Sequence, residues 1–297
     1  MACFFALAAC SDRDTALAPH DDLIAAVDQR LAAWGTAIDI DPLRTSQVNT
    51  TALEGCPHES VDGQSLFFAS DRSGNIDIWV AHRGPDGSWG VPEALPAPVN
   101  SSANDFCPTP LPGGGLLFVS TRADGQNCGS GTADIYETQS IQNGGWTSPA
   151  NLGCTVNSAG NEFSPSLVHA GGGMLFFSSD RAGKHQLYVS LQERGSWSAP
   201  AAITELNYVG FNSARPNVSQ DGMEIVFDSD RPLGSGGFDI WYSQRATPRG
   251  EWLPPINLGA GVNSVASETR ASFTRNRGQL YFGSTRAGSS DIYTAYR

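Results

Sequence analysis

The sequence carries little charge and no basic stretch. Only 16% of its 297 residues are charged, and 18 Lys and Arg residues stand against 30 Asp and Glu, which gives a net charge of −12. Nucleic-acid binding needs a basic surface that neutralises phosphate groups, so nucleic acid is not expected as a partner. A protein or a small polar ligand remains the expected partner.

Long apolar runs and familiar catalytic motifs are also missing. No apolar run reaches the roughly 20 residues that a membrane-spanning helix needs. The chain contains no Gly-x-Ser-x-Gly motif and no Cys-x-x-Cys pair, and its glycine triplets at 113–115 and 171–173 suit hairpin turns rather than phosphate loops. His58 and His169 lack ligand partners at useful spacing and are expected to line a core or a channel. We therefore expect neither a metal nor a cofactor.

What the sequence does contain is a fivefold repeat. A short apolar run ends in polar residues and an arginine, and a triplet such as Asp-Ile-Trp follows, most fully at 66–72 and 77–79. The arginines recur with a period near fifty residues: Arg72, Arg122, Arg181, Arg231 and Arg286. Such a period, with several short strands in each unit, is typical of a β-propeller. The sequence predicts an all-β, five-bladed propeller of four-stranded blades over residues 48–297.

The first ten residues are similar to an export signal. The tetrad Leu7-Ala8-Ala9-Cys10 resembles a bacterial lipoprotein signal, in which cleavage leaves Cys10 as a lipid-modified N-terminal residue. Ser11 at the next position would favour sorting to the outer membrane in that family. The segment is short and has no basic start, so an ordinary secreted protein is the alternative. We expect residues 1–10 to be a signal, Cys10 to be the membrane attachment, and the protein to lie at the periplasmic face of the outer membrane.

Residues 11–47 form an N-terminal extension. Leu23, Val27 and Leu31 follow helical spacing after two aspartates, which predicts a short helix over about 22–34. The last repeat ends just after its third strand, so a strand over about 38–49 is expected to complete it and close the ring. Trp34 matches the tryptophan that recurs near the outer strand of other repeats.

Alternating strand directions define one face of the propeller. With the strands of a blade named A to D from the centre outward, the D–A and B–C connections share this face, which we call the mouth face. Four repeats begin strand A there with a carboxylate: Glu54, Asp105, Glu162 and Glu268. The fourth repeat has Ser213 instead, with Arg215 two residues on. These six residues are the candidate binding set at the channel mouth.

Two roles are open for the four carboxylates. Each is expected to pair with a repeat arginine and so to join neighbouring blades. The second hypothesis is a carbohydrate-active enzyme, because glycoside cleavage needs two carboxyl groups, one protonated and one charged. The positions where the pattern fails, Ser213 with Arg215 and Gln186 in place of the aspartate of the third repeat, are where a specific function is expected.

The repeats contain an even number of cysteines. In an exported chain this favours disulfides over metal binding. Cys56 and Cys107 occupy equivalent positions in adjacent repeats, whereas Cys128 and Cys154 lie in two loops of one repeat. Of the three possible pairings, these positions favour Cys56–Cys107 with Cys128–Cys154.

One repeat carries a family resemblance. Pro57, Asp62-Gly63, the run 66–72, Gly74 and the triplet 77–79 follow an order that resembles the WD40-like repeat of the TolB β-propeller family. The resemblance implies a periplasmic or outer-membrane-associated scaffold. The chain departs from that family in showing five repeats rather than six and no separate N-terminal α/β domain. We expect a monomeric propeller that binds a protein or ligand in the cell envelope, with a glycoside-hydrolase-like enzyme as the alternative.

Overall fold

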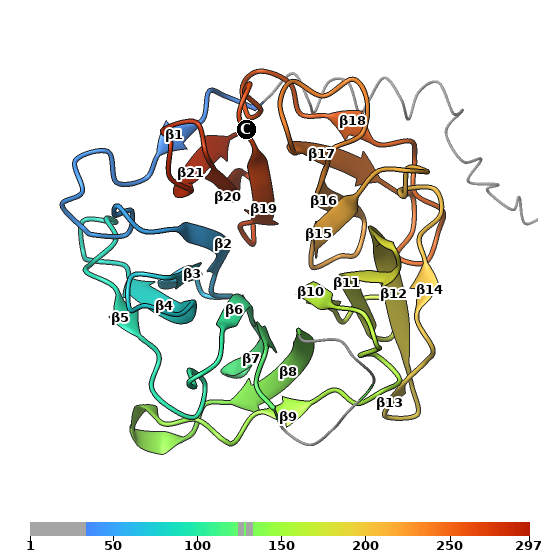
Figure 1. Cartoon of the computed structure of the whole chain (residues 1–297), viewed down its shortest axis with the longest axis horizontal. Coiled ribbons are helices and arrows are strands. Elements are labelled where there is room, and N and C mark those ends of the chain that lie inside the picture. Colours follow the sequence, from blue (N-terminus) through green and yellow to red (C-terminus); the bar gives the residue numbers. More distant parts are fainter. Residues whose placement is uncertain (1–33, 124–127, 129–132) are drawn as a thin grey trace, which may run out of the picture. The chain divides into compact units, whose positions relative to one another are not determined.

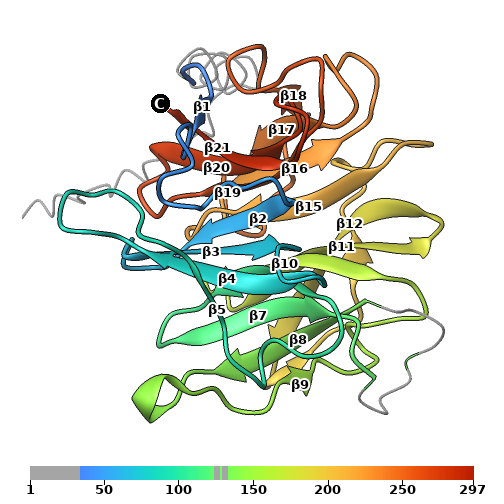
Figure 2. The same cartoon turned by 60° about the vertical axis from the view of Figure 1, so that its left-hand side comes forward.

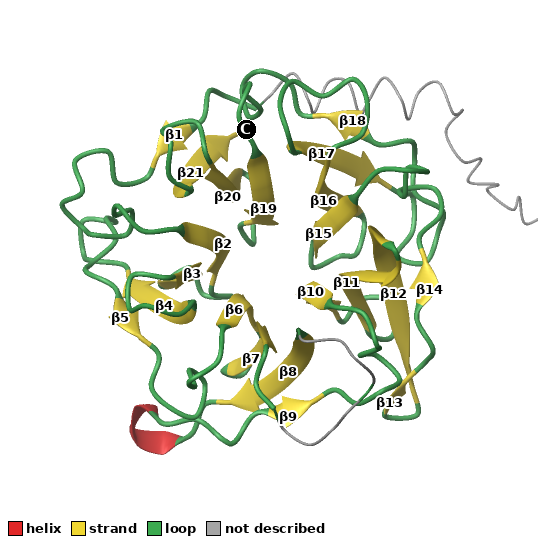
Figure 3. Cartoon of the chain, viewed as in Figure 1, coloured by secondary structure: helices red, strands yellow, loops and turns green. Residues whose placement is uncertain are grey.

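Five antiparallel sheets surround a central channel in the computed structural model, which describes residues 34–123, 128 and 133–297 (Figure 1). The five-bladed propeller expected from the repeats is thus confirmed. The segment 1–10 and the helix expected over about 22–34 lie outside the described residues. Among the described residues the one helical element is a short 3₁₀ turn, η1 (Gln142–Gly144), seen in Figure 3, and no helix is long and apolar enough to cross a membrane.

Each blade runs from an inner strand A to an outer strand D. Blade 1 contains β2 (Glu54–Glu59), β3 (Ser65–Ser70), β4 (Asp77–His82) and β5 (Glu93–Ala94). Blade 2 contains β6 (Asp105–Pro110), β7 (Gly115–Ser120), β8 (Asp134–Gln139) and β9 (Ala150–Asn151). Blade 3 contains β10 (Glu162–Val168), β11 (Met174–Ala182) and β12 (Lys184–Glu193), with β13 (Ser196–Trp197) and β14 (Ala201–Ala202) both paired to β12. Blade 4 contains β15 (Ser213–Val218), β16 (Glu224–Ser229), β17 (Asp239–Gln244) and β18 (Ile256–Asn257).

Blade 5 joins the two ends of the described chain. Its strands are β19 (Glu268–Phe273), β20 (Gln279–Ser284), β21 (Asp291–Tyr296) and β1 (Ile38–Asp39), and β1 pairs antiparallel with β21 (Figure 2). The strand expected over about 38–49 is limited to these two residues. The side chain of Asp41 accepts hydrogen bonds from the main-chain N–H groups of Ser46 and Val48, and this turn ends the strand.

Trp34 lies at the outer edge of the same blade. The guanidinium of Arg297 lies 5.0 Å from the centre of the Trp34 ring. Arg83 covers Trp89 in blade 1 at 4.0 Å. Trp34 is therefore the counterpart of the outer tryptophan of another blade, as the sequence predicts.

The hydrophobic core lies between the blades rather than at the centre. Strand B of each blade is covered on both faces, and every residue of β7 and β16 is buried. Between blades 1 and 2, for example, Ile78 and Val80 pack with Leu116 and Phe118. Because apolar side chains fill the gaps between sheets, the channel itself can be lined by polar groups.

A repeated asparagine holds each D–A connection to strand C. The side chain of Asn263 accepts a hydrogen bond from the N–H of Ile240 at 2.8 Å and donates one to its carbonyl oxygen at 3.0 Å. The same two bonds to strand C are made in every blade: Asn49, Asn100, Asn157, Asn207 and Asn263. Since buried main-chain polar groups need partners, the asparagine continues the hydrogen bonding where the two-residue outer strand ends.

Replacing this asparagine should destabilise the whole propeller. In Asn263→Ala the N–H and carbonyl of Ile240 lose buried partners, which should lower the free energy of unfolding by about 1–3 kcal/mol. Urea denaturation followed by tryptophan fluorescence measures the change. Gln142→Ala, at an exposed position in η1, is the control, and equal stability of the two variants would contradict the assignment.

Candidate functional site

The four carboxylates predicted at the channel mouth are buried in ion pairs. Their side chains have no exposed surface, and each meets the arginine that follows strand B of its own blade. The pairs and their N–O distances are Arg72–Glu54 at 2.9 Å, Arg122–Asp105 at 2.7 Å, Arg181–Glu162 at 2.9 Å and Arg286–Glu268 at 3.2 Å. The expected pairing is present in these four blades, but both partners of each pair belong to the same blade, so the pairs do not join neighbouring blades as expected. We call these four pairs the arginine lattice.

Glu268 shows how completely such a carboxylate is engaged. It accepts hydrogen bonds from the main-chain N–H and the hydroxyl of Ser264 and from the hydroxyl of Ser284, each at 2.7 Å. Arg286 adds the ionic contact and lies over the ring of Tyr293. A carboxylate held by four donors has little capacity left to transfer a proton or to bind a ligand.

Ser213 belongs to the same structural arrangement. Its hydroxyl accepts a hydrogen bond from Arg231 at 2.9 Å, and Arg231 also donates to the carbonyl oxygen of Leu206 at 2.6 Å. Burial lowers the pKa of Arg231 to about 10. The break in the fourth repeat therefore leaves Arg231 without a carboxylate and does not place Ser213 on an open surface.

The other break, at Gln186, coincides with a different B–C connection. Gln186 lies opposite Ser179, and the pairing of β11 with β12 continues to Ala182 and Lys184. Blade 3 thus continues the strand pairing into a connection that, between the same paired positions, is a loop of equal length in blades 1 and 5.

A second ring of side chains lines the channel itself. It consists of the third residue of each strand A, and we call it the bulge ring: Cys56, Cys107, Ser164, Arg215 and Arg270. All five have positive φ values between 49° and 59°, and the register of the A–B pairing shifts at each of them. A β-bulge redirects a side chain, and non-glycine residues in this region are strained by roughly 1 kcal/mol or more. Each blade contains this strained residue, and as a result one side chain from every blade lines the channel.

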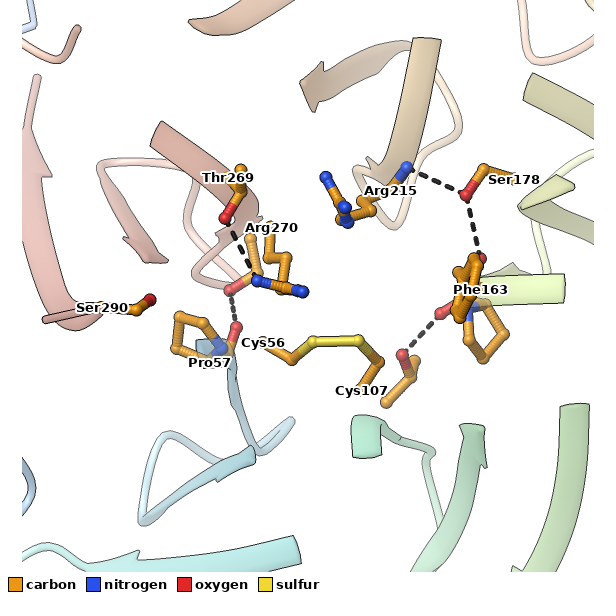
Figure 4. Close-up of a disulfide and its surroundings, with 12 residues drawn as sticks. Cys56, Pro57, Cys107, Phe163, Ser178, Arg215, Thr269, Arg270 and Ser290 are labelled. Atoms are coloured by element: carbon orange, nitrogen blue, oxygen red, sulfur yellow. Dashed lines mark hydrogen bonds between the residues drawn. A yellow bond between two sulfur atoms is a disulfide. The ribbon is translucent and has the colours of Figure 1, made fainter. Parts of the chain in front are cut away.

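Two members of the bulge ring form a disulfide. Cys56 and Cys107 link blades 1 and 2 across the channel (Figure 4), and Cys128 joins Cys154 within blade 2. Both pairings favoured by the sequence are present. At the level of the bulge ring the channel narrows to a cavity of about 30 Å³.

Arg215 and Arg270 share one buried carboxylate. Asp228, in β16, accepts a hydrogen bond from the guanidinium of Arg215 and another from the main-chain N–H of Arg270, the latter at 2.9 Å. Burial raises the pKa of Asp228, against the opposing effect of Arg215. Burial also lowers the pKa of Arg270 to about 10, and the charge of Arg215 adds to that shift.

Arg215 is among the residues predicted from the sequence, whereas Arg270 and Asp228 are not. Arg270 follows Glu268 by two residues, as Arg215 follows Ser213, so the register of the repeats could have found it. Asp228 follows the apolar run Ile225–Phe227 of β16, and the matching residues of the other blades are the uncharged Ala69, Val119, Ser178 and Gly283. An acidic residue at a buried position of strand B was the signal that could have identified Asp228.

The far end of the channel holds a larger cavity. Its volume is about 180 Å³, and His58, Glu59, His169 and Arg275 are among the residues that line it. Both histidines thus line the channel, as expected. Burial lowers the pKa of His58 to about 4, so this ring is neutral at pH 7. In residues 34–123, 128 and 133–297, no three His, Cys, Asp or Glu side chains gather in a way that could hold a metal ion.

Comparisons with known proteins identify the fold alone. No family model matches the sequence, and neither does any curated protein. The endo-arabinase from Bacteroides thetaiotaomicron has a similar structure, with a TM-score of 0.58 and 12% identity over 89% of this chain and 97% of the other. A putative TolB from Agrobacterium tumefaciens has a TM-score of 0.51 and 17% identity, over 86% of this chain and 79% of the other.

TolB from Acinetobacter baumannii is also similar, with a TM-score of 0.48 and 17% identity over 81% of this chain. This chain spans only 53% of the length of that TolB. At these identities the likeness extends to the propeller fold. TolB propellers and glycoside-hydrolase propellers both occur among the similar structures, so the comparisons favour neither class.

Proposed function

We propose that this chain is a non-hydrolytic β-propeller that binds a protein or ligand in the bacterial cell envelope. The observation that carries the proposal is the burial of all four inner carboxylates in the arginine lattice. A glycosidase needs two carboxyl groups about 5–10 Å apart on either side of the scissile bond. Here each inner carboxylate is committed to an arginine of its own blade.

Exposed apolar side chains on the mouth face support a protein partner. Val209, Leu233 and Val265 are 92%, 93% and 91% exposed, and all three lie in D–A or B–C connections of blades 4 and 5. The N–H of Gly237 donates to the carbonyl oxygen of Ala266, which joins two of these connections. These side chains in the loops of one face offer apolar surface that a bound protein would remove from water.

The cysteines support an exported location. Two disulfides are expected in a protein of an oxidising compartment and are rare in a reducing one. With the lipoprotein-like sequence at Cys10, we propose an attachment at the periplasmic face of the outer membrane, the secreted form being the alternative.

A hydrolysis assay tests the class of function. The full chain, incubated with arabinan and a panel of other polysaccharides, should release no reducing ends above the buffer control, because each of the four inner carboxylates is paired with an arginine. Release that disappears in a folded Glu162→Gln variant would instead establish an enzyme.

The lattice carboxylates should matter for stability. Glu268→Gln leaves Arg286 without its buried counter-charge, so the free energy of unfolding should fall by about 3 kcal/mol or more. Denaturant titration measures this. Glu93→Gln removes an exposed carboxylate beside His82 and should change stability by less than about 0.5 kcal/mol. Similar values for both variants would show that the lattice does not stabilise the fold.

Expression in a Gram-negative bacterium tests the anchor. The unaltered chain should partition into the detergent phase of a Triton X-114 extraction, and Cys10→Ala should move it to the aqueous phase, because one modified cysteine carries the lipids. Equal partitioning of the two proteins would argue for the secreted form.

A further inference from the structure

We propose that Arg215, Arg270 and Ser164 form an anion site in the channel that receives the carboxylate group of a ligand. The inference rests on the proposed binding function and specifies the ligand's chemistry. Figure 4 shows the two guanidinium groups projecting into the channel from blades 4 and 5, with the Cys56–Cys107 disulfide facing them. All five of these residues line the cavity of about 30 Å³.

The guanidinium of Arg270 is held in place but has few partners. Its Nη1 donates to the hydroxyl of Thr269 at 3.3 Å, which is the one hydrogen bond its head group makes to the described residues. The Arg270 side chain reaches Gly55 in blade 1. A Cβ atom added to Gly55 would lie 3.5 Å from Nη1 of Arg270. Blades 2 and 3 have Phe106 and Phe163 at the position of Gly55. The glycine leaves room for an arginine head with most of its donors unused.

The local charge is positive in an acidic protein. Two arginines enter the channel, and Asp228 is the carboxylate that contacts them both. One Asp228 oxygen is taken by the guanidinium of Arg215 and the other by the main chain of Arg270. One cationic charge is therefore left without a counter-charge, whereas every arginine of the lattice has its own carboxylate.

Unused hydrogen-bond donors point to the same chemistry. The hydroxyl of Ser164 is buried and has no partner among the described residues, although it lines the cavity beside the two arginines. Buried polar groups are normally satisfied, and a site rich in donors and poor in acceptors is completed by an anion.

Size and surroundings favour a carboxylate over a larger group. The cavity has room for about one small group and none for a sugar ring. A carboxylate matches the flat, forked donors of a guanidinium. The rings of Phe106 and Phe163, with centroids 5.9 Å apart, precede Cys107 and Ser164 in the chain and pack against the core cluster that contains Cys56 and Cys107. The carboxylate of a small apolar acid and that of a C-terminal residue of a protein share this chemistry.

Calorimetry with matched probes tests the site. At low ionic strength, N-acetylphenylalanine should bind the full chain, and N-acetylphenylalaninamide, which lacks the charge, should bind at least tenfold more weakly. The peptide acetyl-Ala-Ala-Phe with a free C-terminus, compared with its amide, separates the two sources: tighter binding of the peptide acid assigns the site to chain ends, and tighter binding of the amino-acid derivative assigns it to free acids. Equal binding of acids and amides overturns the proposal.

Variants test whether Arg270 is responsible for binding of the acid. Arg270→Gln should weaken binding of the acid at least tenfold, whereas Arg249→Gln, which changes an exposed arginine bound to the carbonyl of Gly171, should leave it unchanged. Should Arg270→Gln not fold, a crystal of the unaltered protein soaked in bromide decides the question. An anomalous peak between the two guanidinium groups supports the site, and no peak there overturns it. Cleavage of a glycan in the hydrolysis assay would refute the proposed non-hydrolytic function. It would not decide whether the carboxylate site exists, which depends on these binding experiments alone.

Discussion

The buried pair of a repeat arginine and an inner carboxylate is the contact on which four of the five blades depend. In blade 1, Arg72 reaches Glu54 at the start of strand A, the hydroxyl of Ser70 at the end of strand B, and the carbonyl oxygen of Val48 in the preceding connection. Its guanidinium also lies over the ring of Trp79 in strand C. One side chain thus fixes the relative positions of four segments. Breaking such a pair is costly because it leaves a charge buried without a partner, even where the pair adds little net stability over an apolar replacement.

This arrangement separates the residues that build the blades from those that are free to do something else. The lattice uses the first position of strand A and the arginine after strand B, so variation there is restricted by the fold. The third position of strand A is different, since its side chain leaves the sheet at a bulge and enters the channel. Cysteine, serine and arginine all occur at this position, and the blade is the same in each case. The bulge ring is therefore where one propeller of this kind can differ chemically from another.

Much of this could be predicted from the sequence because it repeats. The five blades, the arginine–carboxylate pairs and the Cys56–Cys107 disulfide follow from the recurrence of like residues at like positions, whereas Cys128–Cys154 follows from the position of two loops in one repeat. The channel position was harder to foresee, because the bulge shifts the A–B register by a residue and so changes which side chains face inward. The role of Asp228 depends on contacts between blades, which a pattern within one repeat does not contain. The strand expected up to residue 49 was too long, because the side chain of Asp41 turns the chain after only two paired residues.

Two kinds of arginine can now be told apart by what surrounds them. An arginine of the lattice, such as Arg122, has its own carboxylate, a hydroxyl and two carbonyl oxygens as acceptors. Arg270 has one hydroxyl at 3.3 Å and shares the charge of Asp228 with Arg215. A residue with a purely structural role would be expected to gather acceptors as the lattice arginines do, since a partly buried guanidinium is costly to leave unsatisfied. Keeping two arginines and one carboxylate together beside the cavity of the bulge ring is best explained if the missing acceptor arrives with a ligand.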